Sequence, residues 1–352
     1  MNLKRLRRLR LIDWFAVLLS TLAIGVCLWS MRPAPTKRDL PKSRGTDAFV
    51  VPTSFAGLLA LNSQDLGKVD IASMNLLCAQ GLPGSENLNP ALSLRTLDDW
   101  ARQVRDNTER HLYRLSDARY ADHYHRSQAY FRCELMLQTL QEDCRVHYNS
   151  KLVDPRTGLS TEWPFVDSRD FFLHGIVGPD RAGSCSSMPV LYVAIGRRLG
   201  YPMKLVRTAD HLFCRWDDPS GERINVEGSG NGFSAFPDEY YKSWPRPLTD
   251  QQIRANGFLR SLDPAEELAV FVAMRGHCFT DTGRRSEAVA AYRQAQSLAP
   301  EIVSQALIFQ AEATNAASEV ALQAHRIASQ RLTEDILRRQ SSFRPMGALG
   351  QN

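Results

Sequence analysis

The chain has 352 residues, of which 43% are hydrophobic and 23% are charged, which is the composition of an ordinary globular protein. Its net charge of +5 does not indicate nucleic-acid binding, because the positive charge is concentrated at one end. Residues 1–38 contain eight Lys and Arg residues and one Asp, so residues 39–352 carry a net charge of −2. The main part of the chain therefore lacks the basic character of a nucleic-acid-binding protein.

The first part of the chain has the pattern of a membrane anchor. Residues 14–31 contain no charged side chain, a Trp stands near each end, and the preceding residues 1–10 are rich in Lys and Arg. A helix of this length matches the apolar thickness of a bilayer, and a basic flank stays in the cytoplasm. We expect a cytoplasmic tail over residues 1–10, a transmembrane helix over residues 11–31, and the bulk of the chain outside the cytoplasm. A cleaved signal peptide is the alternative, although no A-x-A site follows.

A folded domain is predicted to begin after this anchor. Residues 32–47 are rich in Pro and charge and form a linker, and the domain extends over residues 48–262. Helical spacing of apolar side chains predicts a helix over residues 96–115, with Thr96 as its N-cap, and a second helix over residues 128–148. These two segments indicate a helical lead-in to the rest of the domain.

The middle of the domain changes from a helix to short strands. A helix is predicted from Ser184, as its N-cap, to Gly200, which ends it. Strands are predicted over residues 203–208, 211–216 and 222–228, and the turn sequence DDPSG joins the last two. Antiparallel strands that follow a helix predict an α+β fold rather than βαβ units.

The C-terminal part has the pattern of a helical repeat. Residues 269–300 match the tetratricopeptide repeat, and residues 263–340 are predicted as a helical domain before a tail over residues 341–352. The matching small, aromatic and proline positions are Gly276, Phe279, Gly283, Ala288, Tyr292, Ala295 and Pro300. Because a single repeat cannot bury its faces alone, we expect it to pack on the preceding domain. A peptide-binding groove is the alternative role.

Cys185 is the candidate nucleophile, because it stands at a predicted helix start. Unpaired N–H groups and the helix dipole at such a position favour the thiolate, which is the reactive form of cysteine. His211, which begins the second strand, is the candidate base. Asn225 and Glu227 lie on the same face of the third strand, so either could orient the imidazole, and spacing does not choose between them. By the same alternation Cys214 points away from His211 and is expected in the core.

No metal or cofactor is expected from the sequence. The seven cysteines include no C-x-x-C pair and predict no disulfide framework. His123 and His125 lack a third metal ligand, and no Gly-rich phosphate loop is present. The segment over residues 231–245 is rich in aromatic side chains, which could wall a substrate cleft or pack in the core.

The segments GSCSSMPVLYVAIGRRLGYP, HLFCRW and INVEGSGNGF resemble the transglutaminase-like superfamily of papain-type folds. That core has Cys at a helix start, His on a strand and Asp on the next strand. More narrowly, the chain is similar over residues 95–300 to bacterial SirB-like proteins, which place such a core before tetratricopeptide repeats. The resemblance gives the role of Asp to Glu227, a departure from the family pattern. Asn225 would instead form a papain-like set of Cys, His and Asn.

The resemblance implies a cysteine-dependent amide hydrolase or acyltransferase. The Cys185 thiolate would attack an amide carbonyl, His211 would transfer protons, and the backbone N–H of Cys185 would stabilise the oxyanion. Hydrolysis is preferred over cross-linking, because nothing marks a site for an amine acceptor. The expected partners are the membrane and a peptide or protein substrate at the bacterial cell envelope. The alternative is a catalytically silent scaffold in which the same fold and repeat bind a partner protein.

Overall fold

The computed structural model describes residues 49–152, 164–219, 221–228, 230, 232–313, 330 and 334. The chain divides into two units, residues 1–50 and 51–352, and the architecture below is that of the second unit. The predicted anchor, linker and C-terminal tail lie outside the described residues. Within the described ranges, no helix is long and apolar enough to cross a membrane.

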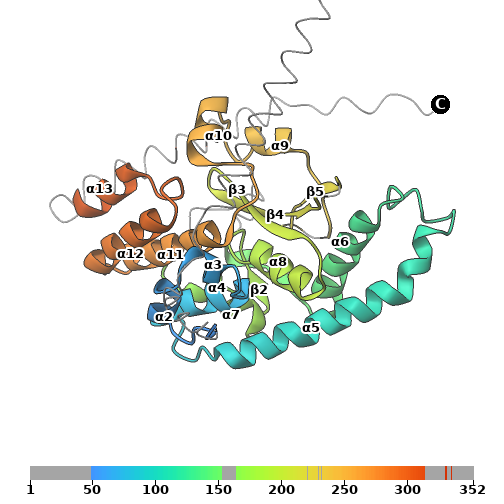
Figure 1. Ribbon diagram of the computed structural model, residues 1–352, viewed down its shortest axis with the longest axis horizontal. Helices are drawn as coiled ribbons and strands as arrows, with labels where there is room; N and C mark the ends of the chain where they lie inside the picture. Colours follow the sequence, from blue (N-terminus) through green and yellow to red (C-terminus); the bar gives the residue numbers. More distant parts are fainter. Residues whose placement is uncertain are drawn as a thin grey trace, which may run out of the picture. The chain divides into compact units, whose positions relative to one another are not determined.

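The fold is mixed α+β, with helices before and after a small antiparallel sheet (Figure 1). The helices before the sheet are α2 (Phe55–Leu59), α3 (Ser63–Leu66), α4 (Ile71–Ala79), α5 (Pro90–His111), α6 (Gln128–Gln138), α7 (Leu173–Val177) and α8 (Met188–Arg198). Every residue of α4 is buried, and this helix contacts α5, α7 and α8. The apolar core therefore surrounds α4 and α8, and α8 follows directly after Cys185.

The two helices of the predicted lead-in differ from their expected bounds. The first begins at Pro90 rather than Thr96, because the Asn89 side chain accepts the backbone N–H of Leu92 at 3.0 Å and caps the helix. Thr96 lies inside this helix, where its hydroxyl donates to the Leu92 carbonyl. The second ends its α-helical part at Gln138 and continues as a π-helical turn over Thr139–Asp143, so its predicted extension to residue 148 is wrong.

The end of α8 is the one predicted. Gly200 has φ +75°, a conformation that glycine adopts without a steric penalty. Its N–H donates to the Arg197 carbonyl at 3.1 Å, and the Tyr201 N–H donates to the Gly196 carbonyl at 2.8 Å. These two bonds satisfy carbonyls that the helix end would otherwise leave without partners, which ends α8 and starts the first strand.

The predicted strands form one antiparallel sheet in the order β3-β4-β5. The strands are β3 (Met203–Thr208), β4 (His211–Asp217) and β5 (Arg223–Val226). The third strand is shorter than the predicted 222–228, because Glu227 pairs with Ser234 in an isolated bridge instead of with β4. Cys214 pairs with Val226, so side chains alternate between two faces as expected. Helices α6 and α8 contact the sheet. On the face that carries His211, Val206 and Phe213 pack against Tyr241 of α9 (Asp238–Ser243). A two-residue parallel pair, β1 (His147–Tyr148) with β2 (Ala182–Gly183), was not predicted.

Three further helices follow α9 and α10 (Asp250–Asn256): α11 (Pro264–Asp281), α12 (Arg285–Leu298) and α13 (Gln305–Ala313). Helix α11 packs on α4, and the Arg275 guanidinium donates to the Cys78 and Gln80 carbonyls at 2.9 and 2.5 Å. Arg197 of α8 donates two hydrogen bonds to the fully buried Glu267 of α11. The helical segment thus packs on the preceding domain, as the sequence predicts.

The ion pair between Arg197 and Glu267 is expected to stabilise this packing. Replacing Glu267 with Ala leaves the Arg197 charge partly buried without its partner, which we expect to lower the free energy of unfolding by about 3 kcal/mol. Glu287→Ala is the control, because its pair with Arg284 is exposed and is worth less than about 1 kcal/mol. Denaturant unfolding of both variants measures the difference, and equal losses would contradict the structural role of Glu267.

Candidate active site

The turn before α8 presents Cys185. Ser187, not the predicted Ser184, is the N-cap of α8, although the Ser184 carbonyl accepts the Met188 N–H at 2.9 Å. The backbone N–H of Ser184 donates to the Ser187 hydroxyl, and the Ser184 hydroxyl accepts the Ser186 N–H. These bonds hold the turn that contains Cys185. Among the six cysteines of the described ranges, all of them free thiols, Cys185 alone is not buried.

His211 is the first residue of β4 and lies next to Cys185. Its Nε2 is 2.8 Å from Oε2 of Glu227, and the Cys185 side chain lies close enough to raise the pKa of the ring. Because the carboxylate occupies Nε2, Nδ1 is the ring nitrogen that is left for the thiol. Asp210, the neighbouring carboxylate, is exposed and pairs with Arg246 at 3.1 Å. Asp210 therefore does not orient the ring.

Two opposing effects determine the pKa of His211. Burial disfavours the charged ring, but hydrogen bonds to Cys185 and Glu227 and the negative charges of these groups outweigh burial and raise the pKa to about 9. At neutral pH the imidazole is therefore protonated while it contacts the thiol.

Glu227 lies at the end of β5 and is buried. Its backbone N–H donates to the Ser234 carbonyl at 2.9 Å, which keeps this position extended beside the next segment. Its Oε2 atom accepts two hydrogen bonds, from His211 and from the Tyr241 hydroxyl at 3.2 Å. The structure therefore brings Cys185, His211 and Glu227 together.

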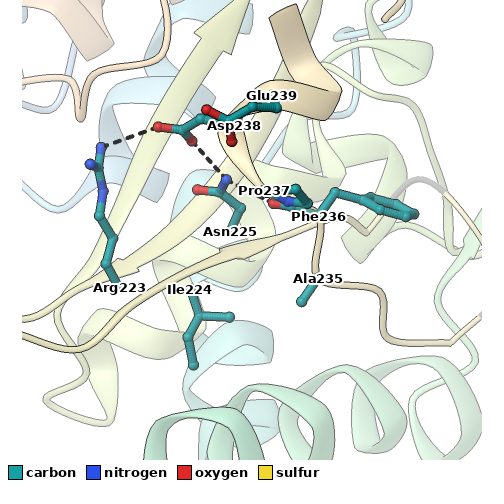
Figure 2. Close-up of a pocket in the computed structure, with 8 residues that line it drawn as sticks. All are labelled: Arg223, Ile224, Asn225, Ala235, Phe236, Pro237, Asp238 and Glu239. Carbon is teal, nitrogen blue, oxygen red and sulfur yellow. Dashed lines mark hydrogen bonds and ion pairs between the residues drawn. The ribbon is translucent and has the colours of Figure 1, made fainter. Parts of the chain in front are cut away.

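Asn225 lies on the same face as Glu227, as the alternation predicts, but it bonds other groups. In the register it pairs with Arg215, whose Nε donates to the Asn225 oxygen at 2.6 Å. The Asn225 amide donates to Asp238 at 2.8 Å and to the Phe236 carbonyl at 2.9 Å (Figure 2). Asn225, Phe236 and Asp238 line an open pocket of about 390 Å³. Asn225 is therefore held in a separate polar cluster and does not orient His211.

The loop after Glu227 is held by two side chains that the sequence did not single out. The Tyr192 hydroxyl of α8 donates to the Gly228 carbonyl at 3.2 Å. Gln141, in the π-helical turn, accepts the Gly232 N–H at 2.6 Å and donates to the Gly230 carbonyl at 3.3 Å. Neither a lone Tyr inside an apolar helix nor a Gln in a polar run signals such a role. The contacts depend on segments that are far apart in the chain.

Part of the aromatic segment over residues 231–245 packs around His211. Tyr241 lies parallel to the His211 ring at 6.3 Å between ring centroids, and Trp244 meets it edge-on at 4.6 Å. Tyr241 also stacks on Phe213 at 3.8 Å. These rings separate the hydrogen bond between His211 and Glu227 from water on this side. The aromatic content was visible in the sequence, but the individual contacts were not.

Cys214 and His123, which the sequence analysis named, and the buried His174 bond groups outside this site. Cys214 is buried on the opposite face of the sheet, and its thiol is 3.5 Å from the Val226 carbonyl. His174 bonds Ser168, and burial lowers its pKa to about 4, so it is neutral. His123 pairs with Glu134 at 2.8 Å, and the described side chains form no group of three that could hold a metal.

The chain was compared with family models, curated proteins and solved structures. No family model, no curated protein and no solved structure matches the chain. The functional argument therefore depends on the residues of the site.

Gly228 is expected to tolerate no side chain. A Cβ atom there would lie 1.9 Å from a ring carbon of Tyr192, whereas Gly230 has open space around it. We expect Gly228→Ala to displace Glu227 and to lower the free energy of unfolding by about 2 kcal/mol, because the site is overpacked. Denaturant unfolding should show a loss below about 0.5 kcal/mol for Gly230→Ala, the control in the same loop. Similar losses in both variants would contradict the contact with Tyr192.

The charge of Glu227 is expected to hold His211 protonated. Because Glu227 is one of the two groups that raise the pKa of His211, with Cys185 as the other, Glu227→Gln should lower this pKa from about 9. Histidine NMR titration of the full chain measures it, and a His211→Gln variant identifies the signal. Asn225→Ala should leave the pKa near 9. A larger shift in Asn225→Ala than in Glu227→Gln would reverse the assignment of the two residues.

Proposed function

We propose that the protein is a cysteine-dependent amide hydrolase or acyltransferase that uses Cys185, His211 and Glu227. The observation that carries the proposal is a thiol beside a buried imidazole that is itself hydrogen-bonded to a buried carboxylate. This arrangement activates nucleophiles in unrelated folds, and it is recognised by geometry and not by sequence position. Hydrolysis of the acyl group by water is preferred over its transfer to an amine.

The first half-reaction forms a thioester. The Cys185 thiolate attacks the amide carbon and forms a C–S bond, while the carbonyl electron pair moves to oxygen. The oxyanion is stabilised by the backbone N–H of Cys185 in the turn before α8. When the oxyanion collapses, the C–N bond breaks, and the leaving amine takes the proton from Nδ1 of His211. Glu227 holds the ring in position and compensates its charge until the proton is transferred.

The second half-reaction restores the site. A water molecule gives a proton to the neutral His211, and the oxygen attacks the thioester carbon. The C–S bond then breaks, which releases a carboxylic acid and regenerates the thiolate beside the imidazolium. If an amine replaces water, the same steps form a new amide bond. The protein residues return to their initial protonation states in both cases.

The finer fold assignment and the cellular setting are parts of the same proposal. A helix that carries Cys, followed by strands that carry His and the acid, supports a transglutaminase-like core. In α11 and α12, the close approach of Gly276 to Tyr292 supports a tetratricopeptide-type helix pair. We propose that residues 11–31 anchor the chain in the membrane, so that the site acts on peptide or protein at the outer side of that membrane.

Formation of an acyl-enzyme tests the proposed reaction. With p-nitrophenyl acetate as the acyl donor, the wild-type chain should release nitrophenol in a burst of one equivalent and acquire an acetyl group on Cys185, detected by mass spectrometry. His211→Ala should lower the acylation rate at pH 7 by about a hundredfold or more, because the thiolate loses its partner.

A control variant separates reactivity from exposure, since Cys185 is also the most accessible thiol of the described ranges. Cys185→Ser combined with Ser186→Cys moves the thiol one residue along the same half-buried turn, away from His211. We expect this variant to lose the burst. If it reacts as fast as wild type, or if His211→Ala does, Cys185 is only an exposed thiol, and the alternative of a protein-binding scaffold is favoured.

A further inference from the structure

Tyr241 makes a contact in the site that the proposed reaction does not by itself require. Its hydroxyl is 3.2 Å from Oε2 of Glu227, the same oxygen atom that His211 contacts at 2.8 Å. The side chain is fully buried, and burial and the Glu227 charge raise the pKa of its phenol. The hydroxyl therefore stays protonated and donates its hydrogen to the carboxylate.

The position of Tyr241 is fixed independently of this hydrogen bond. The ring stacks on Phe213 at 3.8 Å with an angle of 6° between the planes, and the Thr208 hydroxyl donates to the Tyr241 carbonyl at 3.0 Å. The Tyr241 hydroxyl is thus a rigidly placed donor, and it faces the flexible side chain of Glu227, which accepts its hydrogen bond. Glutamate has one more rotatable bond than aspartate, so its carboxylate needs a second contact to stay on the imidazole.

We propose that Tyr241 is a positioning residue that holds the Glu227 carboxylate on His211, so that the functional unit contains four side chains. This inference rests on the proposed function, because it assigns Tyr241 a role in that site. Its test is the pKa of His211, which can be measured whether or not Cys185 reacts. The Tyr241 hydroxyl bonds the Glu227 carboxylate and acts on His211 through it, whereas the ring packs beside the imidazole. Its hydroxyl allows the longer Glu to serve where the resembling family has Asp.

Several titratable groups surround Glu227 and enter the interpretation of any titration. They are His211 and Cys214 of β4, Tyr192 of α8, and Tyr240 and Tyr241 of α9. Burial raises the pKa of the Cys214 thiol and of the three phenols, so these groups are neutral near pH 7. His211 is therefore the group whose titration reports the position of the Glu227 carboxylate.

Tyr241→Phe tests the proposal, because it removes the hydroxyl and keeps the stacked ring. In the full chain, we expect the NMR-measured pKa of His211 to fall by about one unit, since the carboxylate no longer stays on the ring. Tyr240→Phe, a neighbour on α9, should leave this pKa unchanged. An unchanged or raised pKa of His211 in Tyr241→Phe would overturn the proposal, because a carboxylate that stays in place without its second donor would stabilise the imidazolium at least as well.

A double-mutant cycle separates positioning from a merely structural role. In a Glu227→Gln background, adding Tyr241→Phe should shift the pKa of His211 by no more than about 0.3 units, because no carboxylate remains to be positioned. A further fall of a full unit would mean that Tyr241 acts on His211 by another route and would overturn the inference. If the His211 shifts are as expected but Cys185 forms no acyl-enzyme, Tyr241 keeps its role and only the proposed reaction fails.

Discussion

The buried hydrogen bond between His211 and Glu227 is the interaction on which the rest of the site depends. Taking an imidazolium and a carboxylate out of water costs several kcal/mol per charge, and only close pairing with further hydrogen bonds offsets this cost. The surrounding structure supplies the close pairing and the further hydrogen bonds. Tyr241 donates to the carboxylate, the aromatic rings exclude water, and Cys185 occupies the second side of the imidazole.

The fold holds these three side chains at the ends of separate elements. The turn before α8 presents the thiol, β4 begins with the imidazole, and the carboxylate follows β5. Their relative positions are maintained by contacts behind the site. Tyr192 of α8 bonds the chain directly after Glu227, and Arg197 at the other end of the same helix bonds Glu267 of α11. The helix that follows the nucleophile is thus fixed to both the sheet and the C-terminal helices.

The sequence predicts an element correctly where interactions between neighbouring residues determine its structure. The strand over residues 203–208 and the end of α8 at Gly200 follow from β-propensity and from the tolerance of glycine for a positive φ. The sequence predicts the start of α5 at Thr96, six residues late, whereas Asn89 caps the helix and Pro90 occupies its first position. The sequence does not predict the π-helical turn after α6, which carries Gln141 and places it against a loop about ninety residues away.

The sequence by itself determined the order of thiol, imidazole and acid. It also determined that Asn225 and Glu227 point to the same side of the extended segment that contains β5, because side chains alternate along any extended strand. Only the tertiary structure decided between these two residues. The register sets Asn225 opposite Arg215, and α9 supplies Asp238 to complete that polar cluster. Glu227 lies closer to His211 and meets Tyr241. Strand register and helix packing arise from contacts between distant segments, and no local pattern encodes them.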